Sequence, residues 1–271
     1  MNPAVSDAER LRQWDVVRVL AANPGPLTMS GTNSWVVGRD PAWVVDPGPA
    51  LAEHLEKLAG ELEQRGGLGG IALTHDHIDH SEGVAALRER FPAPLAAARA
   101  HEGSPKGHTA GGPADVRLRD GARVGPFEAL YTPGHAVDHF ALLVGGVGFV
   151  GDAVLGEGSV FVAPDPGALA GYLKGLERLL EHDLEVLCPG HGPPIWAPRE
   201  RITEYIDHRL DRERRLVAAL AEGRRGTEDL LDAAWSDVPE QLRPLAAVTL
   251  VAHLDKLEEE GLLPEGVERA C

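Results

Sequence analysis

Residues 70–80 read GIALTHDHIDH. The first four of them are apolar and are predicted to form a buried strand. The loop that follows carries His75, His77, Asp79 and His80, and imidazole and carboxylate groups are common ligands of divalent metals. A strand that delivers such a loop to its carboxyl end predicts a metal site at the edge of a sheet, and with it a metal-dependent chemistry.

Three more apolar segments end in a turn that contains glycine and one ligand-type residue. These residues are His135 after Gly134, Asp152 after Gly151, and His191 after Gly190. Glycine lets the backbone bend sharply at a strand end and brings the next side chain to the rim of the sheet. With the first loop, the turns supply five imidazoles and two carboxylates. This inventory suits two divalent ions that share one bridging carboxylate and a bridging water.

Hydrophobic periodicity predicts the elements around these turns. Strand-like patterns occupy residues 16–20, 34–37, 42–46, 116–118, 127–131, 140–144, 147–150 and 185–188. Helical spacing predicts helices at 51–64, at 167–181 and after Ser81, which is expected to cap its helix. Strands separated by helices, in two successive halves, indicate an α/β or α+β sandwich. After about Pro198 the chain is helix-rich and charged, with helices expected at 202–220, 227–235 and 245–259.

The composition is that of a soluble globular protein, and its acidic charge disfavours long-range attraction to nucleic acids or membranes without excluding a local basic groove. A length of 271 residues with 43% hydrophobic residues predicts one large domain, or one domain with a small appendage, around a sizeable core. The net charge of −16 repels phosphates and anionic membrane surfaces. Two cysteines, Cys188 and Cys271, indicate no disulfide framework. No secretory signal is apparent and the longest apolar stretch, 140–150, is shorter than the roughly 20 residues of a membrane span, so a cytoplasmic location is expected.

Four separated motifs resemble the metallo-β-lactamase superfamily in its binuclear hydrolase form, and they occur in the family's order. They are residues 74–83, 133–135, 151–152 and 189–192. Residues 23–26, 31–33 and 155–158, with the helical tail, are similar to the group of lactamase-beta-like protein 2 and its bacterial relatives. The resemblance implies an α+β fold, a four-layer αββα sandwich over residues 1–198. It also implies a helical, winged-helix-like C-terminal domain over residues 199–271.

The same resemblance implies two sets of metal ligands. His75, His77 and His135 would bind the first ion, Asp79, His80 and His191 would bind the second, and Asp152 would bridge them. Two zinc ions per chain are expected, with manganese or iron as alternatives. Catalysis would use a metal-bridged hydroxide, and Asp79 is expected to be catalytic because its family counterparts are thought to handle protons.

Four further residues are predicted to support the site. Asp46 ends a strand and is expected to orient a ligand histidine, with a turn or capping role as the alternative. Thr32, Asn33 and His139 are candidates for substrate contact. For Thr32 and Asn33 the alternative is to stabilise a turn, and for His139 a role as a packed strand histidine is preferred. His101 and His108, in or beside the polar loop 102–113, are expected to be exposed.

The predicted activity is hydrolysis of an ester, thioester, lactone or phosphodiester. Asp152 stands where the best-known β-lactamases of the superfamily have cysteine, so only weak, promiscuous β-lactamase activity is an alternative. A small-molecule substrate is expected, and a homodimer is an alternative assembly. Two other classes stay open: an iron-dependent oxidoreductase of the same fold, and a non-catalytic binding module.

RNA is an alternative partner, because the group that the chain resembles implies an endoribonuclease acting on single-stranded RNA. From Arg201 onward, however, the chain has 10 Lys and Arg residues and 16 Asp and Glu residues. This acidic balance is unlike that of a typical nucleic-acid-binding winged helix. Arg209, Arg212, Arg214 and Arg215 cluster on the predicted long helix, and a salt-bridged solvated face is the preferred interpretation.

Overall fold

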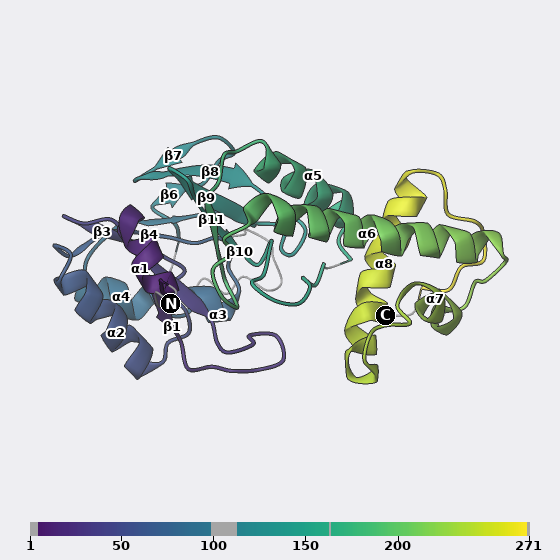
Figure 1. The fold of residues 1–271 in the computed structure, drawn as a ribbon, viewed down its shortest axis with the longest axis horizontal. Coiled ribbons are helices and arrows are strands. Elements are labelled where there is room, and N and C mark those ends of the chain that lie inside the picture. The colour runs from purple at the N-terminus through teal and green to yellow at the C-terminus, as the bar shows by residue number, and fades with distance from the viewer. Residues whose placement is uncertain (1–4, 99–112, 163, 270–271) are drawn as a thin grey trace. The chain divides into compact units, whose positions relative to one another are not determined.

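The computed structural model describes residues 5–98, 113–162 and 164–269 (Figure 1). The chain divides into two compact units. The sheet unit comprises Met1–Tyr131, Asp138–Gly158 and Asp183–Pro198, and the helical unit comprises Thr132–Val137, Ser159–His182 and Arg199–Cys271. His101, His108 and the predicted loop 102–113, apart from Pro113, lie outside the described residues.

The first sheet of the sheet unit has six strands. In spatial order they are β1 (Val16–Leu20), β2 (Asn33–Val37), β3 (Ala42–Val45), β4 (Leu68–Ala72), β5 (Leu95–Ala97) and β6 (Val116–Arg117). The β1–β2 and β2–β3 pairs are antiparallel, whereas β3, β4, β5 and β6 run parallel. Parallel strands end at the same edge of a sheet, so the residues after β3 and β4 come together.

The second sheet has five strands. Their spatial order is β11 (Val186–Pro189), β10 (Val147–Gly151), β9 (Phe140–Val144), β8 (Phe127–Tyr131) and β7 (Arg123–Val124). Only β10 and β11 are parallel. The turns after these two strands, which carry Asp152 and His191, therefore lie at one edge.

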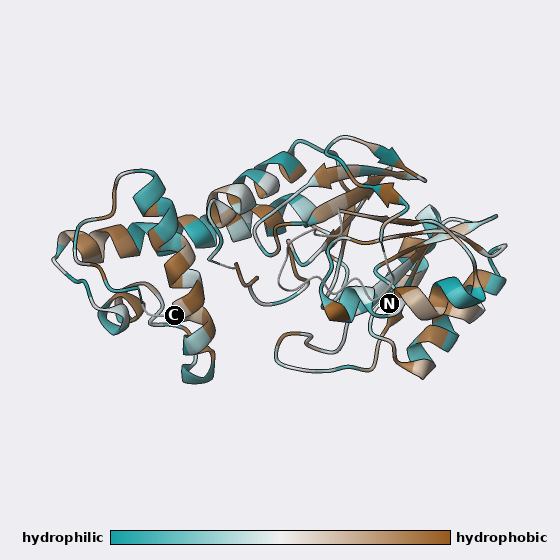
Figure 2. Ribbon diagram, turned by 180° about the vertical axis from the view of Figure 1, so that it is seen from behind, coloured by the Kyte–Doolittle hydropathy of each residue, from teal (hydrophilic) through white to brown (hydrophobic). Residues whose placement is uncertain are grey.

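Alternation along the strands separates two hydrophobic clusters. Trp35 and Val45 pack with Phe127 and Phe149 in the cluster shared by the two sheets. Val36 and Val44, one residue out of phase, pack on the other face with α2 (Ala52–Glu63) and α4 (Val84–Arg90). The strands are correspondingly hydrophobic in Figure 2. Each such strand is buried on both faces, which explains the continuous apolar runs of the sequence.

The helix start predicted at Ser81 is wrong. A short helix, α3 (Ile78–Ser81), ends at this residue, and α4 begins after Gly83. The Ser81 hydroxyl donates to the carbonyls of Asp76 and His77, and the N-cap position of α4 is Gly83, with no side-chain capping bond. Such bonds to preceding carbonyls are a common alternative to capping for serine. The periodicity analysis also missed α1 (Asp7–Leu11), the turn η1 (Arg12–Trp14), β5 and β7.

The helical unit contains α5 (Ala168–Leu180), α6 (Pro198–Ala221), α7 (Thr227–Ala234), η2 (Glu240–Leu242) and α8 (Arg243–Glu259). Leu220, Leu230, Trp235 and Leu254 belong to the core that α6, α7 and α8 share. The described part of this unit has no strand, but the N–H of Glu268 donates to the carbonyl of Arg225 at 2.9 Å and brings the two segments side by side.

None of the helices in the described ranges has both the length and the apolar character needed to cross a bilayer.

Candidate metal centre

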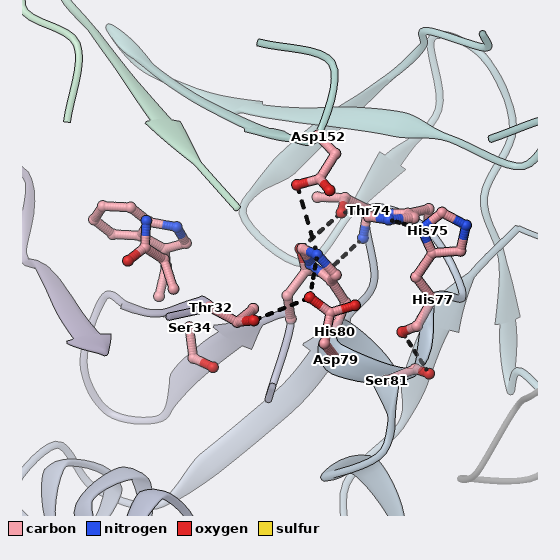
Figure 3. A network of polar contacts seen from close by, with 12 residues as sticks. Thr32, Ser34, Thr74, His75, His77, Asp79, His80, Ser81 and Asp152 are labelled. Carbon is pink, nitrogen blue, oxygen red and sulfur yellow. Dashed lines mark hydrogen bonds and ion pairs between the residues drawn. The ribbon is translucent and has the colours of Figure 1, made fainter. Parts of the chain in front are cut away.

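Four strand ends of the sheet unit carry Asp46, which was predicted to orient a ligand, and all the predicted ligands except His135. Asp46 follows β3, the loop 73–80 follows β4, Asp152 follows β10 and His191 follows β11. Figure 3 shows the side chains of the β4 loop and Asp152 directed toward one another. The convergence follows from the parallel pairing of β3 with β4 and of β10 with β11.

His75 and His77 face each other with their ring nitrogens. Nε2 of His75 lies 3.0 Å from Nδ1 of His77. His75 is buried and His77 is exposed. The Thr74 hydroxyl gives its one proton to Oδ2 of Asp46 at 2.7 Å, so it accepts from Nδ1 of His75 at 3.0 Å. Nε2 of His75 is therefore assigned as the unprotonated nitrogen, the form that binds a metal.

Asp79, His80 and His191 form a second group. One ligand atom from each lies within 4.8 Å of the others. Oδ2 of Asp79 is 3.5 Å from Nε2 of His80 and 3.4 Å from Nε2 of His191. Among the described residues, buried Nε2 of His80 has no hydrogen-bond partner. A buried nitrogen left without a partner costs about 1–3 kcal/mol, whereas a divalent cation would satisfy it.

The outer nitrogens of this group are held in the protonation state that a metal requires. Nδ1 of His80 lies 3.0 Å from Oδ2 of Asp46, and Nδ1 of His191 lies 3.3 Å from the carbonyl oxygen of Gly31. Carboxylate and carbonyl oxygens only accept, so both Nδ1 atoms donate. Nε2 is then the nitrogen of each ring that a metal would bind in place of a proton, and both Nε2 atoms lie toward Asp79. The residues fit a divalent metal by chemistry as well as by spacing.

The carboxylates around this group favour a positive charge among them. Burial alone would lower the pKa of His80, but the carboxylates of Asp152, Asp46 and Asp79 raise it to about 10. Burial also opposes protonation of His191, yet Asp152 raises its pKa. The Asp152 oxygens lie 3.6 Å from Nε2 of His80 and 3.3 Å from Nε2 of His191. In the metal-free chain, protons supply the positive charge that a metal would otherwise bring.

Two glycines leave room for these side chains. A Cβ at Gly190 would lie 2.6 Å from Cε1 of His80 and would also collide with Oδ1 of Asp152. A Cβ at Gly151, where φ is +44°, would lie 2.8 Å from Nε2 of His139. The glycine in each ligand turn thus provides space as well as backbone freedom.

Asp46 lies where a partner of a ligand histidine is needed. Its carboxylate accepts from the backbone N–H and hydroxyl of Thr74, both at 2.7 Å, and from Nδ1 of His80. One buried side chain therefore links the loop that carries the first two histidines with His80.

Asn33 and His139 lie behind the ligands. Asn33 is fully buried, and its Nδ2 donates to the carbonyls of Pro189 and Gly192, both at 2.9 Å. The buried His139 accepts from the backbone N–H of Asp152 at 3.2 Å. The substrate contacts expected for both stay predictions, and the geometry favours support of the turns that carry His191 and Asp152.

His135 lies in the segment Thr132–Val137, which clusters with the helical unit. Its Nδ1 donates to the carbonyl of Phe161 at 3.1 Å, which leaves Nε2 as the unprotonated nitrogen. Its membership of the first ligand set stays a prediction.

The sequence analysis did not single out Thr74, Asn23 or Arg18. Arg18 donates to Oδ1 of Asn33 at 2.6 Å, and Asn23 bonds to Thr32. For Thr74, the sequence did offer a signal, because it is a polar residue at the end of an apolar strand. Asn23 belongs to the segment 23–26 that carries the family resemblance, but its contact with Thr32, like that of Arg18 with Asn33, is fixed only by folding.

Residues 27–191 match the family model of the "Metallo-beta-lactamase superfamily", and residues 227–265 match the "Beta-lactamase associated winged helix domain". The chain therefore belongs to the metallo-beta-lactamase superfamily, whose members have mostly hydrolase-type functions. The α+β metallo-β-lactamase fold with a C-terminal winged-helix domain is confirmed. The division at residue 198 stays a prediction.

Two curated relatives are similar over most of their length. The "Beta-lactamase-like protein 2 homolog" of Drosophila melanogaster is 32% identical over 92% of this chain and 89% of its own. The "Atrochrysone carboxyl ACP thioesterase" of Aspergillus chevalieri is 33% identical over 89% of this chain and 79% of its own. The predicted resemblance to the lactamase-beta-like group is thus confirmed.

Two solved structures extend the comparison. A metallo-beta-lactamase family protein of Thermus thermophilus aligns with a TM-score of 0.71 and 23% identity over 91% of this chain and 94% of its own. TTHA1623 "in a di-iron-bound form" aligns with a TM-score of 0.53 and 29% identity over 68% of this chain and 95% of its own. The first supports the fold, and the second is a neighbour with a stated metal.

Proposed function

We propose that this protein is a binuclear zinc-dependent hydrolase that acts on a small ester or thioester. The observation that carries the proposal is the group of Asp79, His80 and His191, whose ligand atoms lie within 4.8 Å of one another. The group includes the buried Nε2 of His80, which lacks a hydrogen-bond partner within the described part of the chain. Beside it lie Asp152 and the facing rings of His75 and His77.

The residues would divide between two ions. His75, His77 and His135 would hold the first, Asp79, His80 and His191 the second, with Asp152 between them. When bound, a pair of divalent ions lowers the pKa of water toward neutrality and polarises the bond under attack. The Asp79 side chain is 24% exposed to solvent and can accept a proton at the surface of the site. His80 and His191 are oriented by Asp46 and Gly31 from behind.

Two observations favour a small carbonyl substrate over a long polyanion such as RNA. The relative from Aspergillus chevalieri carries a thioesterase name at 33% identity. The charge of −16 disfavours RNA. On α6, Arg214 and Arg215 both pair with Asp211, while Arg209 and Arg212 are buried. The two exposed arginines thus belong to a salt-bridged face, which weakens an RNA-binding role for the cluster.

Iron is the second metal candidate, because the 29% identical TTHA1623 carries two irons in its solved structure. Metal analysis of the purified protein distinguishes the two. A colourless zinc protein supports hydrolysis, whereas a coloured iron protein with oxygen- or persulfide-dependent turnover supports the oxidoreductase alternative.

The test is a panel of hydrolase substrates on metal-analysed protein. It contains an ester, a thioester, a lactone, a β-lactam, a bis-phosphodiester and single-stranded RNA, each compared with the His77→Ala variant. We expect the ester or thioester to be hydrolysed fastest, with a loss of at least about 100-fold in His77→Ala. Fastest cleavage of RNA, or equal activity in the variant, would contradict the proposal.

A further inference from the structure

Thr32 lies directly before β2 in the sheet unit, and it is completely buried beside Asp79. Its Oγ1 lies 3.0 Å from Oδ2 of Asp79 (Figure 3). The same carboxylate oxygen is the one that faces the Nε2 atoms of His80 and His191. Thr32 therefore contacts the oxygen at the centre of the second ligand group.

Asn23 determines where the Thr32 hydroxyl directs its proton. The backbone N–H of Thr32 donates to Oδ1 of Asn23 at 2.9 Å, which places the amide oxygen on that side. Nδ2 of Asn23 then lies 2.9 Å from Oγ1 of Thr32 and donates to it. A hydroxyl has a single proton, and its acceptor side is already engaged by Asn23. The proton therefore goes to Asp79.

We infer that Asn23 and Thr32 are positioning residues that hold Asp79 for the second metal ion, with Asn23 acting through Thr32. The inference rests on the proposed function, because it requires Asp79 to bind an ion. The hydroxyl bond holds Oδ2 toward His80 and His191 before the ion arrives. Less side-chain freedom is then lost on binding, so the ion binds more tightly.

A closed loop keeps Asn23 opposite Thr32. Gly25 and Met29 close the loop by exchanging backbone hydrogen bonds of 3.1 and 2.8 Å. Thr28 is a matched control, because the hydroxyl of this threonine in the same loop donates to the carbonyl of Asn23 at 2.6 Å, outside the series of bonds from Asn23 Nδ2 through Thr32 to Asp79.

The experiment is a stepwise Zn²⁺ titration of the metal-free full chain against a chromophoric chelator. His77→Ala identifies the step that belongs to the first ligand set. We expect Thr32→Val to weaken the second ion about 10–100-fold and to leave the first unchanged, while Thr32→Ser and Thr28→Val stay within about threefold of the unaltered protein.

Asn23→Asp is the sharpest variant, because it keeps the side-chain shape but replaces the donor to Thr32 by an acceptor. Oδ1 still accepts from the backbone of Thr32, and the new oxygen draws the hydroxyl proton away from Asp79. We expect the second ion to bind about 10-fold more weakly, although the added negative charge alone would strengthen cation binding.

Two results would overturn the inference: undiminished second-ion affinity in Asn23→Asp, or a loss in Thr28→Val equal to that in Thr32→Val. Melting temperatures of the metal-free variants check folding, and Asn23→Asp carries the test if Thr32→Val does not fold. If the unaltered chain takes up no second ion, the proposed function fails, and this is seen before any variant is compared.

Discussion

At the scale of single residues, the metal centre depends on hydrogen bonds that assign protons. Oδ2 of Asp46 accepts from both Thr74 and His80, and through Thr74 it also influences His75. One carboxylate thus sets the protonated nitrogen in a predicted ligand of each set. Mutation of such partners behind the ligands typically weakens metal affinity about 10–100-fold.

Gly190 is expected to be intolerant of any side chain. In Gly190→Ala, the new Cβ would collide with Oδ1 of Asp152 and approach Cε1 of His80 to 2.6 Å. Because φ at Gly190 is not positive, the backbone conformation itself allows alanine. We expect second-ion affinity to fall about 10-fold or more, and the melting temperature of the metal-free protein to fall as well because overpacking a buried site costs about 1–3 kcal/mol. The measurement is Zn²⁺ titration combined with thermal unfolding. Gly121→Ala is a control for the added methyl group, because a Cβ there meets no neighbour. It does not control for backbone strain, because φ at Gly121 is +72°. Unchanged affinity would contradict the steric account.

At the scale of elements, long helix α6 shows how burial changes the meaning of a charged sequence. Arg212 is buried, forms an ion pair with Asp237 and donates to the carbonyl of Ala234 at the end of α7. Arg212 also holds the pKa of Asp237 near 2. This arginine connects α6 and α7 within the helical unit. Its burial and its ion pair with Asp237 therefore give it a structural role between the two helices.

The buried His54 connects α2 to the first sheet and should make stability depend on pH. Its Nε2 lies 2.9 Å from Oγ of Ser34 and 3.1 Å from the carbonyl of Pro47, and burial lowers its pKa to about 4. Between pH 6.5 and 4 the unfolded chain binds a proton that folded His54 does not. The free energy of unfolding therefore falls as the pH falls through this window, by at most about 1.4 kcal/mol per pH unit.

Urea unfolding of the metal-free chain at pH 7.5 and pH 5 checks this expectation. Other groups also titrate, so the informative quantity is the difference between the unaltered protein and His54→Gln, whose side chain stays neutral. We expect the unaltered protein to lose about 1–2 kcal/mol more than the variant between these pH values. An equal loss in both would show that His54 does not contribute.

At the scale of the whole molecule, metal binding should be linked to stability. The carboxylates of Asp46, Asp79 and Asp152 raise the pKa of buried His80, so the folded site favours a bound positive charge. Saturation with an ion that binds only the folded state adds about 2.7 kcal/mol at a free concentration 100 times the Kd. Removal of metal with a chelator is therefore expected to lower the melting temperature by several degrees.

Differential scanning calorimetry with and without Zn²⁺ measures this shift, and His191→Gln is the control in which it should be much smaller. A melting temperature that does not respond to Zn²⁺ would count against a metal centre of this kind.

Much of the fold follows from local patterns. The expected strands 16–20, 127–131 and 140–144 have the bounds of β1, β8 and β9, because each is an apolar or β-branched run between turn residues. β5 escaped prediction because Leu95–Ala97 is short and alanine has little strand preference; its neighbours in the sheet make it a strand. Ser81 was misplaced because a hydroxyl can satisfy either a helix start or preceding carbonyls.

Local sequence patterns were enough to indicate the family and the candidate ligands, because ligand chemistry and glycine-marked turns are local properties of residues 75–80, 151–152 and 190–191. The distribution of protons among these ligands, and the polar residues that lie behind them, depend instead on contacts between distant segments. Thr32 meets Asp79 across 47 residues, and Asn33 meets Pro189 across 156. A hydrogen bond needs an approach of about 3 Å between its atoms, and at such separations only the packing of the sheets brings them together.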